Sequence, residues 1–136
     1  MSAGERFFDT NVLLYLLSGD AAKADRAEAL IADGGTISVQ VLNEFAAVAS
    51  RKLGMAWPEI REILAELRAV CRVVPLDLET HEAGLSLAER RRLPVYDALI
   101  VASALRAGCR VLYSEDFQDG QRFEKQLTVR NPFRRA

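Results

Sequence analysis

Hydrophobic and polar positions follow two kinds of pattern along the chain. Short apolar runs predict strands, and longer stretches with apolar residues every three or four positions predict amphipathic helices. Strands are predicted at residues 6–8, 72–74, 110–113 and 127–130, the last as an edge strand that Asn131 and Pro132 end. Helices are predicted at residues 11–17, 21–33, 39–53, 57–69, 78–92 and 97–107. Residues 36–38 form a run too short to assign alone.

Capping residues support several of these helix boundaries. Ser38 is a good N-cap for the helix that follows it, and Pro58 stands at a first turn, where proline is tolerated. The helix at residues 97–107 is apolar around most of its circumference, so it must be buried on nearly all sides. Strands alternating with helices predict an α/β protein: a single three-layer α/β/α domain over residues 1–136 with a mostly parallel central sheet.

Composition limits the function classes. The chain has 136 residues, of which 50% are hydrophobic and 27% charged, as in a folded globular protein. The net charge of −1 gives no sign of a nucleic-acid partner, so a basic surface would have to come from local clustering. We find no leader segment and no apolar run long enough to span a membrane, and we therefore expect a cytoplasmic protein.

Few residues are available for nucleophilic or zinc chemistry. Cys71 and Cys109 lie in strand-like apolar surroundings and are expected to be reduced core thiols. His81 is the only histidine, which makes a histidine-based triad or a histidine-ligated metal site improbable.

Four acidic residues stand where surface charges are not expected. Asp9 follows the first predicted strand, Asp116 follows the strand at residues 110–113, and Asp97 opens the apolar helix. Ligands of open α/β sheets bind beyond the carboxyl ends of the strands, which is where Asp9 and Asp116 belong. Glu44 has apolar neighbours on its helical face, so its carboxylate needs a partner.

Each of these acids also has an ordinary structural explanation. Asp9 or Asp97 could be a helix N-cap, Asp116 a turn residue, and Glu44 could reach water or an arginine. Together they are better explained as a metal site, because carboxylate oxygens suit Mg²⁺ or Mn²⁺ and several nearby carboxylates repel one another without a cation. Such a site can activate water and stabilise the leaving oxygen of a phosphodiester.

Four sequence segments carry a family resemblance. FFDTNVLLYLL, VLNEF, VYDALIVASAL and LYSEDFQDG resemble, in order and spacing, the successive motifs of VapC-type PIN-domain ribonucleases, the toxins of toxin–antitoxin pairs. These segments extend from Phe7 to Gly120, which is nearly the whole chain.

The resemblance implies roles for particular residues. Asp9, Glu44, Asp97 and Asp116 match the family's acidic quartet, which serves as both catalytic and metal-binding residues. Asn11 and Ser114 match polar positions that support the quartet, and Asp119 is a possible extra or substitute ligand, although Asp119 and Glu115 are better interpreted as surface charges. The resemblance further implies Mg²⁺ or Mn²⁺ as cofactor, an RNA substrate, a cognate antitoxin and a homodimer.

Two other functions stay open at this stage. Asp9 could be the nucleophile of a haloacid-dehalogenase-like phosphatase, although Asn11 replaces that class's second aspartate. The chain could also be a non-catalytic PIN-like binding module. The basic runs at residues 51–52, 90–92 and 134–135 could contact RNA, but solvated helix ends explain them as well. Trp57 and Tyr15 could stack on bases, although packing in the core or in a dimer interface is the better interpretation.

Overall fold

A mostly parallel sheet of six strands forms the centre of the protein, in a computed structural model that describes residues 2–134. The strand order is β3-β2-β1-β4-β6-β5. The strands are β1 (Arg6–Phe8), β2 (Gly35–Ser38), β3 (Cys71–Val74), β4 (Val111–Tyr113), β5 (Arg122–Phe123) and β6 (Leu127–Arg130). All neighbouring strands are parallel except β5, which runs antiparallel to β6.

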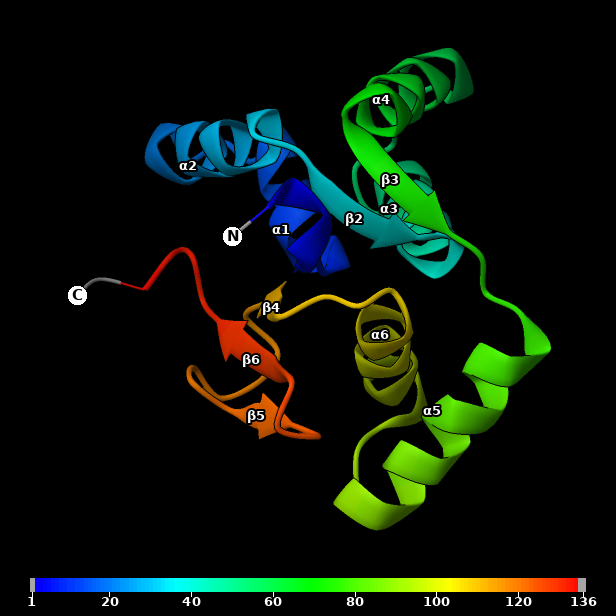
Figure 1. The fold of residues 1–136 in the computed structure, drawn as a ribbon. Coiled ribbons are helices and arrows are strands. Elements are labelled where there is room, and N and C mark those ends of the chain that lie inside the picture. Colours follow the sequence, from blue (N-terminus) through cyan, green and yellow to red (C-terminus); the bar gives the residue numbers. More distant parts are fainter. Residues whose placement is uncertain (1, 135–136) are drawn as a thin grey trace.

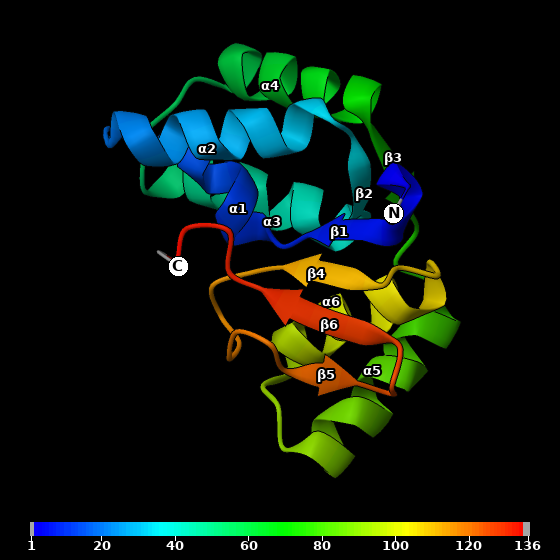
Figure 2. The ribbon, with the colours of Figure 1, turned by 60° about the vertical axis from the view of Figure 1, so that its left-hand side comes forward.

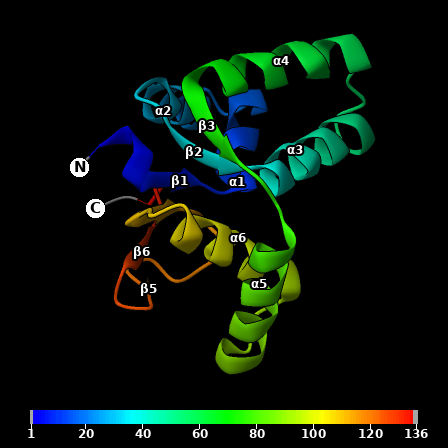
Figure 3. The ribbon, with the colours of Figure 1, turned by 45° about the vertical axis from the view of Figure 1, so that its right-hand side comes forward.

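Helices cover both faces of this sheet. They are α1 (Thr10–Leu14), α2 (Ala21–Ala32), α3 (Val39–Arg51), α4 (Trp57–Val70), α5 (Leu78–Arg91) and α6 (Val95–Arg106), with the 3₁₀ turns η1 (Ala3–Glu5) and η2 (Tyr15–Leu17). Figures 1 and 3 show α2 and α4 on one side of the strands and the paired α5 and α6 on the other. The predicted three-layer α/β/α fold with a mostly parallel sheet is confirmed.

The prediction of residues 127–130 as an edge strand is wrong. β6 pairs with β4 on one side and with the two-residue β5 on the other, as Figure 2 shows. Glu124 and Lys125 adopt left-handed backbone conformations (φ 53° and 56°) and turn the chain between β5 and β6. Hairpin turns of this hand favour Asn-Gly or Asp-Gly, so Glu-Lys gives no sequence signal for the turn.

The helix α6 is the buried centre of its layer, as predicted. Its residues from Ala98 to Ala104 are all buried. Close packing against α5 depends on Gly84, because a Cβ at that position would lie 2.5 Å from the Cδ2 atom of Leu99. The helix begins at Val95, two residues before the predicted start, so Asp97 is not its N-cap; Pro94 occupies that position.

The hydrophobic core is continuous across the layers. Phe7, Phe8, Phe45 and Phe123 are each fully buried. Both cysteines are buried and free, which confirms the prediction of reduced core thiols. None of the helices within residues 2–134 combines the length and apolar character needed to cross a lipid bilayer.

Candidate active site

Strand register brings Asp9 and Ser114 together at the carboxyl edge of the sheet. Phe8 of β1 pairs with Tyr113 of β4, so the residues that follow these two strands are neighbours. The backbone N–H of Asp9 donates to the carbonyl of Tyr113 (3.0 Å), and the Ser114 hydroxyl donates to Oδ2 of Asp9 (2.7 Å). Both side chains are buried. The site is therefore built on two central strands.

Asp9 is a buried carboxyl for which negative charge is costly. It is 3% exposed, and it also caps α1, because its Oδ1 accepts a hydrogen bond from the Thr10 backbone N–H (2.7 Å). Burial raises the pKa of Asp9 from 3.8 to about 7, and the negative charges of Asp116 and Glu44 act in the same direction. Hydrogen bonds from Ser114 and Thr10 offset only part of this rise.

Glu44 finds its partners on two different helices. Its Oε2 accepts from the hydroxyl of Thr10 in α1 (3.1 Å), and its Oε1 accepts from the amide of Gln40, one turn earlier in α3 (2.7 Å). The half-buried carboxylate is thus paired, as its apolar helical face requires. No arginine within residues 2–134 forms an ion pair with it.

Asp97 and Asp116 add the remaining negative charges. Asp97 lies in the first turn of α6 and is half-buried. Burial raises the pKa of Asp97, and the charges of Asp116 and Glu44 raise it further. Asp116 is exposed in the loop after β4. All four predicted acids therefore belong to one electrostatically coupled cluster.

Asn11 and Ser114 connect the ends of β1 and β4. The Asn11 amide donates to the Ser114 hydroxyl oxygen (3.4 Å), and its Oδ1 accepts from the Glu115 backbone N–H (3.3 Å). The same serine oxygen accepts from the Asp116 backbone N–H (3.0 Å). This network holds the loop that carries Asp116 against the loop that carries Asp9.

Sequence reasoning missed two residues of this site, Thr10 and Gln40. Thr10 contacts both Asp9 and Glu44, and Gln40 contacts Glu44 and the carbonyl of Tyr96 (3.1 Å). One signal was available for Gln40, because it lies four residues before Glu44 on the same helix and so shares its face.

Asp119 is engaged elsewhere. Its Oδ1 accepts from the Asn131 backbone N–H (2.8 Å), and its Oδ2 lies 3.6 Å from an Arg134 guanidinium nitrogen. These contacts hold the segment after β6. The position of Asp119 gives no support to its prediction as an extra or substitute ligand. Glu115 lies beside the Tyr15 hydroxyl and raises the pKa of that group.

The basic run at residues 90–92 fastens α5 to β5. Arg90 forms an ion pair with Glu124 (3.3 Å), and Arg91 donates to the Arg122 carbonyl (3.2 Å) while its guanidinium lies 4.6 Å from the Phe123 ring centroid. These contacts favour a structural role for this run. Arg51 and Lys52 are exposed at the end of α3, Arg134 pairs with Asp119, and Arg135 lies outside the described residues.

Aromatic side chains differ in their exposure. Tyr15 packs against Phe133 with ring centroids 4.2 Å apart, which confirms packing for this residue. Trp57 is 58% exposed, so it is not a core residue. Tyr96, which directly precedes Asp97, is 67% exposed. An accessible aromatic ring is therefore carried by the residue before Asp97 in the first turn of α6.

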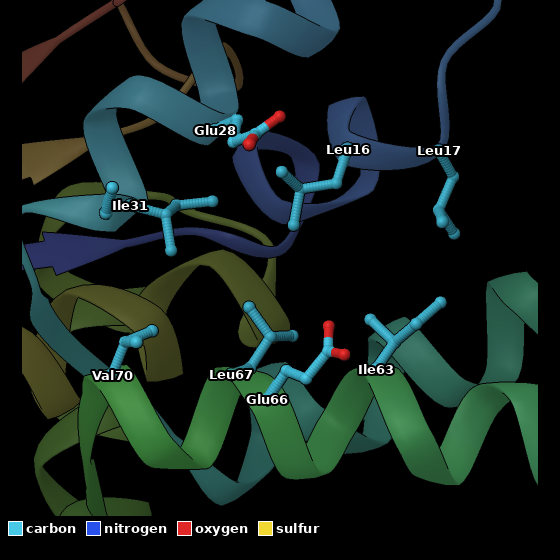
Figure 4. A pocket seen from close by; sticks show the side chains of 9 residues that line it. Leu16, Leu17, Glu28, Ile31, Ile63, Glu66, Leu67 and Val70 are labelled. Carbon is cyan, nitrogen blue, oxygen red and sulfur yellow. The ribbon is translucent and has the colours of Figure 1, made fainter.

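A groove lies apart from the acids. It has a volume of about 370 Å³ and runs between α2, α4 and η2. Figure 4 shows the apolar side chains of Leu16, Ile31 and Leu67 facing into it, with the carboxylates of Glu28 and Glu66 nearby. Because it contains none of the four acids, it is not the candidate active site.

The four carboxylates are suitable ligands for a hard divalent cation, although their side chains are not arranged around a common centre. The charges of Glu44 and Asp116 raise the pKa of both Asp9 and Asp97, and a cation relieves that repulsion. Within residues 2–134, however, no group of three or more acidic, cysteine or histidine side chains already stands close enough to hold a metal ion. Cation binding would require the carboxylates to turn towards one another.

The fold is an α/β/α sandwich, and the four acids gather at the carboxyl edge of its mostly parallel sheet. These two features together are typical of metal-dependent nucleases. The chain belongs to the PIN domain family, because the family's sequence model matches residues 6–122. No curated protein matches the chain significantly.

Several solved structures are similar to this one, and two of them are toxins or contain one. VapC20 of Mycobacterium tuberculosis, a toxin that cleaves the sarcin-ricin loop, is 23% identical with a TM-score of 0.68, over 82% of this chain and 89% of that chain. A toxin–antitoxin complex from Klebsiella pneumoniae contains a chain that is 22% identical with a TM-score of 0.70, over 94% of this chain and 98% of that chain. At these identities the likeness shows a shared fold.

Proposed function

We propose that this protein is a metal-dependent endoribonuclease and the toxin of a toxin–antitoxin pair. The observation that carries the proposal is the coupled cluster of Asp9, Glu44, Asp97 and Asp116 at the carboxyl edge of a PIN-family sheet. Membership of this family removes the support for a phosphatase that uses Asp9 as nucleophile. A non-catalytic PIN-like module is the alternative that an activity assay decides.

The four carboxylates would hold Mg²⁺ or Mn²⁺. When bound, such an ion lowers the pKa of a water molecule and stabilises the leaving oxygen of a phosphodiester. The protein's own residues orient the acids: Ser114 and Thr10 hold the two oxygens of Asp9, and Asn11 holds Ser114. His81, the one histidine, is exposed on α5 and has no place in this scheme.

The substrate we propose is an unpaired loop of RNA. The similar VapC20 is described as cleaving the sarcin-ricin loop, which makes that loop the first RNA to test. The exposed ring of Tyr96 offers a surface on which an unpaired base can stack beside Asp97.

Two protein partners complete the proposal. A cognate antitoxin would silence the enzyme by placing a basic side chain, most simply an arginine, among the carboxylates. The toxin–antitoxin complex with a similar fold supports this part of the proposal. We also propose that the protein is a homodimer, so light scattering should give twice the mass of the chain. Its proposed location is the cytoplasm, where the RNA substrate is found.

A cleavage assay tests the enzymatic proposal. The purified protein is incubated with a sarcin-ricin loop oligonucleotide in EDTA, and then with Mg²⁺ or Mn²⁺ in excess. We expect cleavage only with the added ion and its near-complete loss in Asp9→Asn. The exposed Asp25→Asn on α2 is the matched control and should cleave as wild type does. Cleavage that persists in excess EDTA, or in Asp9→Asn, would contradict the proposal.

A further inference from the structure

Gln40 is a buried polar residue that the four-carboxylate scheme does not use. It lies in the first turn of α3, directly after the N-cap Ser38 and Val39, and is 4% exposed. Its amide nitrogen donates two hydrogen bonds, to Oε1 of Glu44 (2.7 Å) and to the carbonyl of Tyr96 (3.1 Å). Both amide hydrogens are therefore used by groups next to or within the acidic cluster.

Only one orientation of the Gln40 amide is compatible with these neighbours. Glu44 and the Tyr96 carbonyl are both acceptors, so the nitrogen must face them. With the amide reversed, its oxygen would face a carboxylate. The price of the observed orientation is that Oε1 of Gln40 is buried without a hydrogen-bond partner among residues 2–134. The fold therefore provides hydrogen-bond partners for the nitrogen of this amide and not for its oxygen.

The two bonds connect acids from different elements. Glu44 belongs to α3, whereas Tyr96 immediately precedes Asp97 in the first turn of α6. One side chain therefore links the carboxylate of Glu44 to the backbone that carries Asp97. Without it, the half-buried Glu44 would keep only the hydroxyl of Thr10 as a partner and could turn towards water.

We propose that Gln40 is a positioning residue of the acidic site, which keeps the Glu44 carboxylate next to the start of α6, so that only a local rotation is needed to bring it onto a cation. This inference rests on the proposed function, since it assigns Gln40 a role towards the same cation. It predicts that removing the amide weakens cation binding and turnover more than it weakens RNA binding. Partners that orient metal ligands affect metal affinity by about 10–100-fold.

The test replaces Gln40 with methionine, which has a similar length and shape but no N–H donor. Mn²⁺ binding to the metal-free protein is measured by electron paramagnetic resonance of the free ion, independently of activity. We expect Gln40→Met to bind Mn²⁺ about 10–100-fold more weakly, with a lower kcat and an RNA KM near the wild-type value. Gln40→Asn keeps the amide on a side chain that is one methylene shorter. Its Mn²⁺ affinity should lie between those of wild type and Gln40→Met.

Thr80→Val is the control for loss of buried polar contacts. Thr80 is also buried and hydrogen-bonded, but its partners are Asp77 and Arg106, and Arg106 ends α6, whereas Asp97 lies in the first turn of that helix. It should lose stability without losing Mn²⁺ affinity. Melting temperatures of all variants separate stability from cation binding.

A double-mutant cycle distinguishes positioning through Glu44 from a general structural effect. In a Glu44→Gln background, Gln40→Met should change Mn²⁺ affinity by less than twofold, because the group it positions is already gone. Wild-type Mn²⁺ affinity in Gln40→Met, or an equal loss in both backgrounds, would overturn this inference alone. If the wild-type protein neither binds Mn²⁺ nor cleaves RNA, the proposed function fails and this inference fails with it.

Discussion

Replacing Asp9 with asparagine should change how the stability of the metal-free protein depends on pH. Burial raises the pKa of the Asp9 carboxyl from 3.8 to about 7 in the folded protein. Between these two values the unfolded chain loses its proton while the folded chain keeps it. Unfolding then releases a proton, so the free energy of unfolding falls as pH rises and levels off above about pH 7. Asparagine has no proton to lose, and this contribution disappears.

The size of the effect follows from the width of that pH window. Each pH unit contributes about 1.36 kcal/mol for one proton, and about two units of the window lie between pH 5 and the folded-state pKa. The stability of Asp9→Asn relative to wild type should therefore increase by about 2–3 kcal/mol between pH 5 and pH 8. The Asp9 carboxyl accepts from Ser114 and Thr10 as a neutral group at pH 5 and as a charged group at pH 8, and the pKa of about 7 already includes that difference.

Urea unfolding in EDTA at pH 5 and pH 8 measures this difference. Wild type, Asp9→Asn and the exposed control Asp25→Asn are compared at both pH values, with the slope of free energy against urea used to check two-state behaviour. Asp25→Asn should show the pH dependence of wild type. A stability difference between Asp9→Asn and wild type that is equal at pH 5 and pH 8 would refute the argument that burial disfavours the charge on Asp9.

Three further predictions concern the site as a whole. Mn²⁺ at a hundredfold excess over its Kd should stabilise wild type by about 2.7 kcal/mol in thermal unfolding and Asp97→Asn much less, whereas equal shifts would remove Asp97 from the ligand set. Asp116→Asn should abolish RNA cleavage, while Asp119→Asn should retain it because its oxygens serve Asn131 and Arg134; loss of cleavage in Asp119→Asn would show that it takes part. Tyr96→Ala should raise the RNA KM, corresponding to about 1–3 kcal/mol of base stacking, and Trp57→Ala, which removes another exposed aromatic ring, should not; identical KM values for both variants would exclude stacking on Tyr96.

Elements with a strong local pattern could be predicted from the sequence. The apolar face of α3 begins directly after Ser38, and this serine caps the helix by accepting from the Val41 backbone N–H. The nearly all-apolar α6 could only be an interior helix. Its start was misplaced because Asp97 is a residue that favours N-cap positions, whereas Pro94, whose ring presets the backbone, precedes the first turn. β5 lacked any local signal, since two residues show no periodicity.

The candidate site was predictable only in part, for a related reason. A carboxylate that directly follows an apolar strand, as Asp9 does, can be recognised from the sequence alone. Contacts across the fold do not: the bond from Thr10 to Glu44 joins residues 34 positions apart, and the bond from Gln40 to the Tyr96 carbonyl joins residues 56 apart. Such pairs depend on how α1, α3 and α6 pack, which the hydrophobic pattern does not specify at the level of single hydrogen bonds.

The place of β4 in the sheet also has a consequence for timing during synthesis. The strand made after α6 inserts beside β1, the first strand made, and carries the Ser114 that pairs with Asp9. A growing chain that has not reached this strand has Asp9 without Ser114 and lacks Asp116. The acidic cluster of an unfinished chain is therefore incomplete, and it can form only after β4 and the loop that carries Asp116 have left the ribosome.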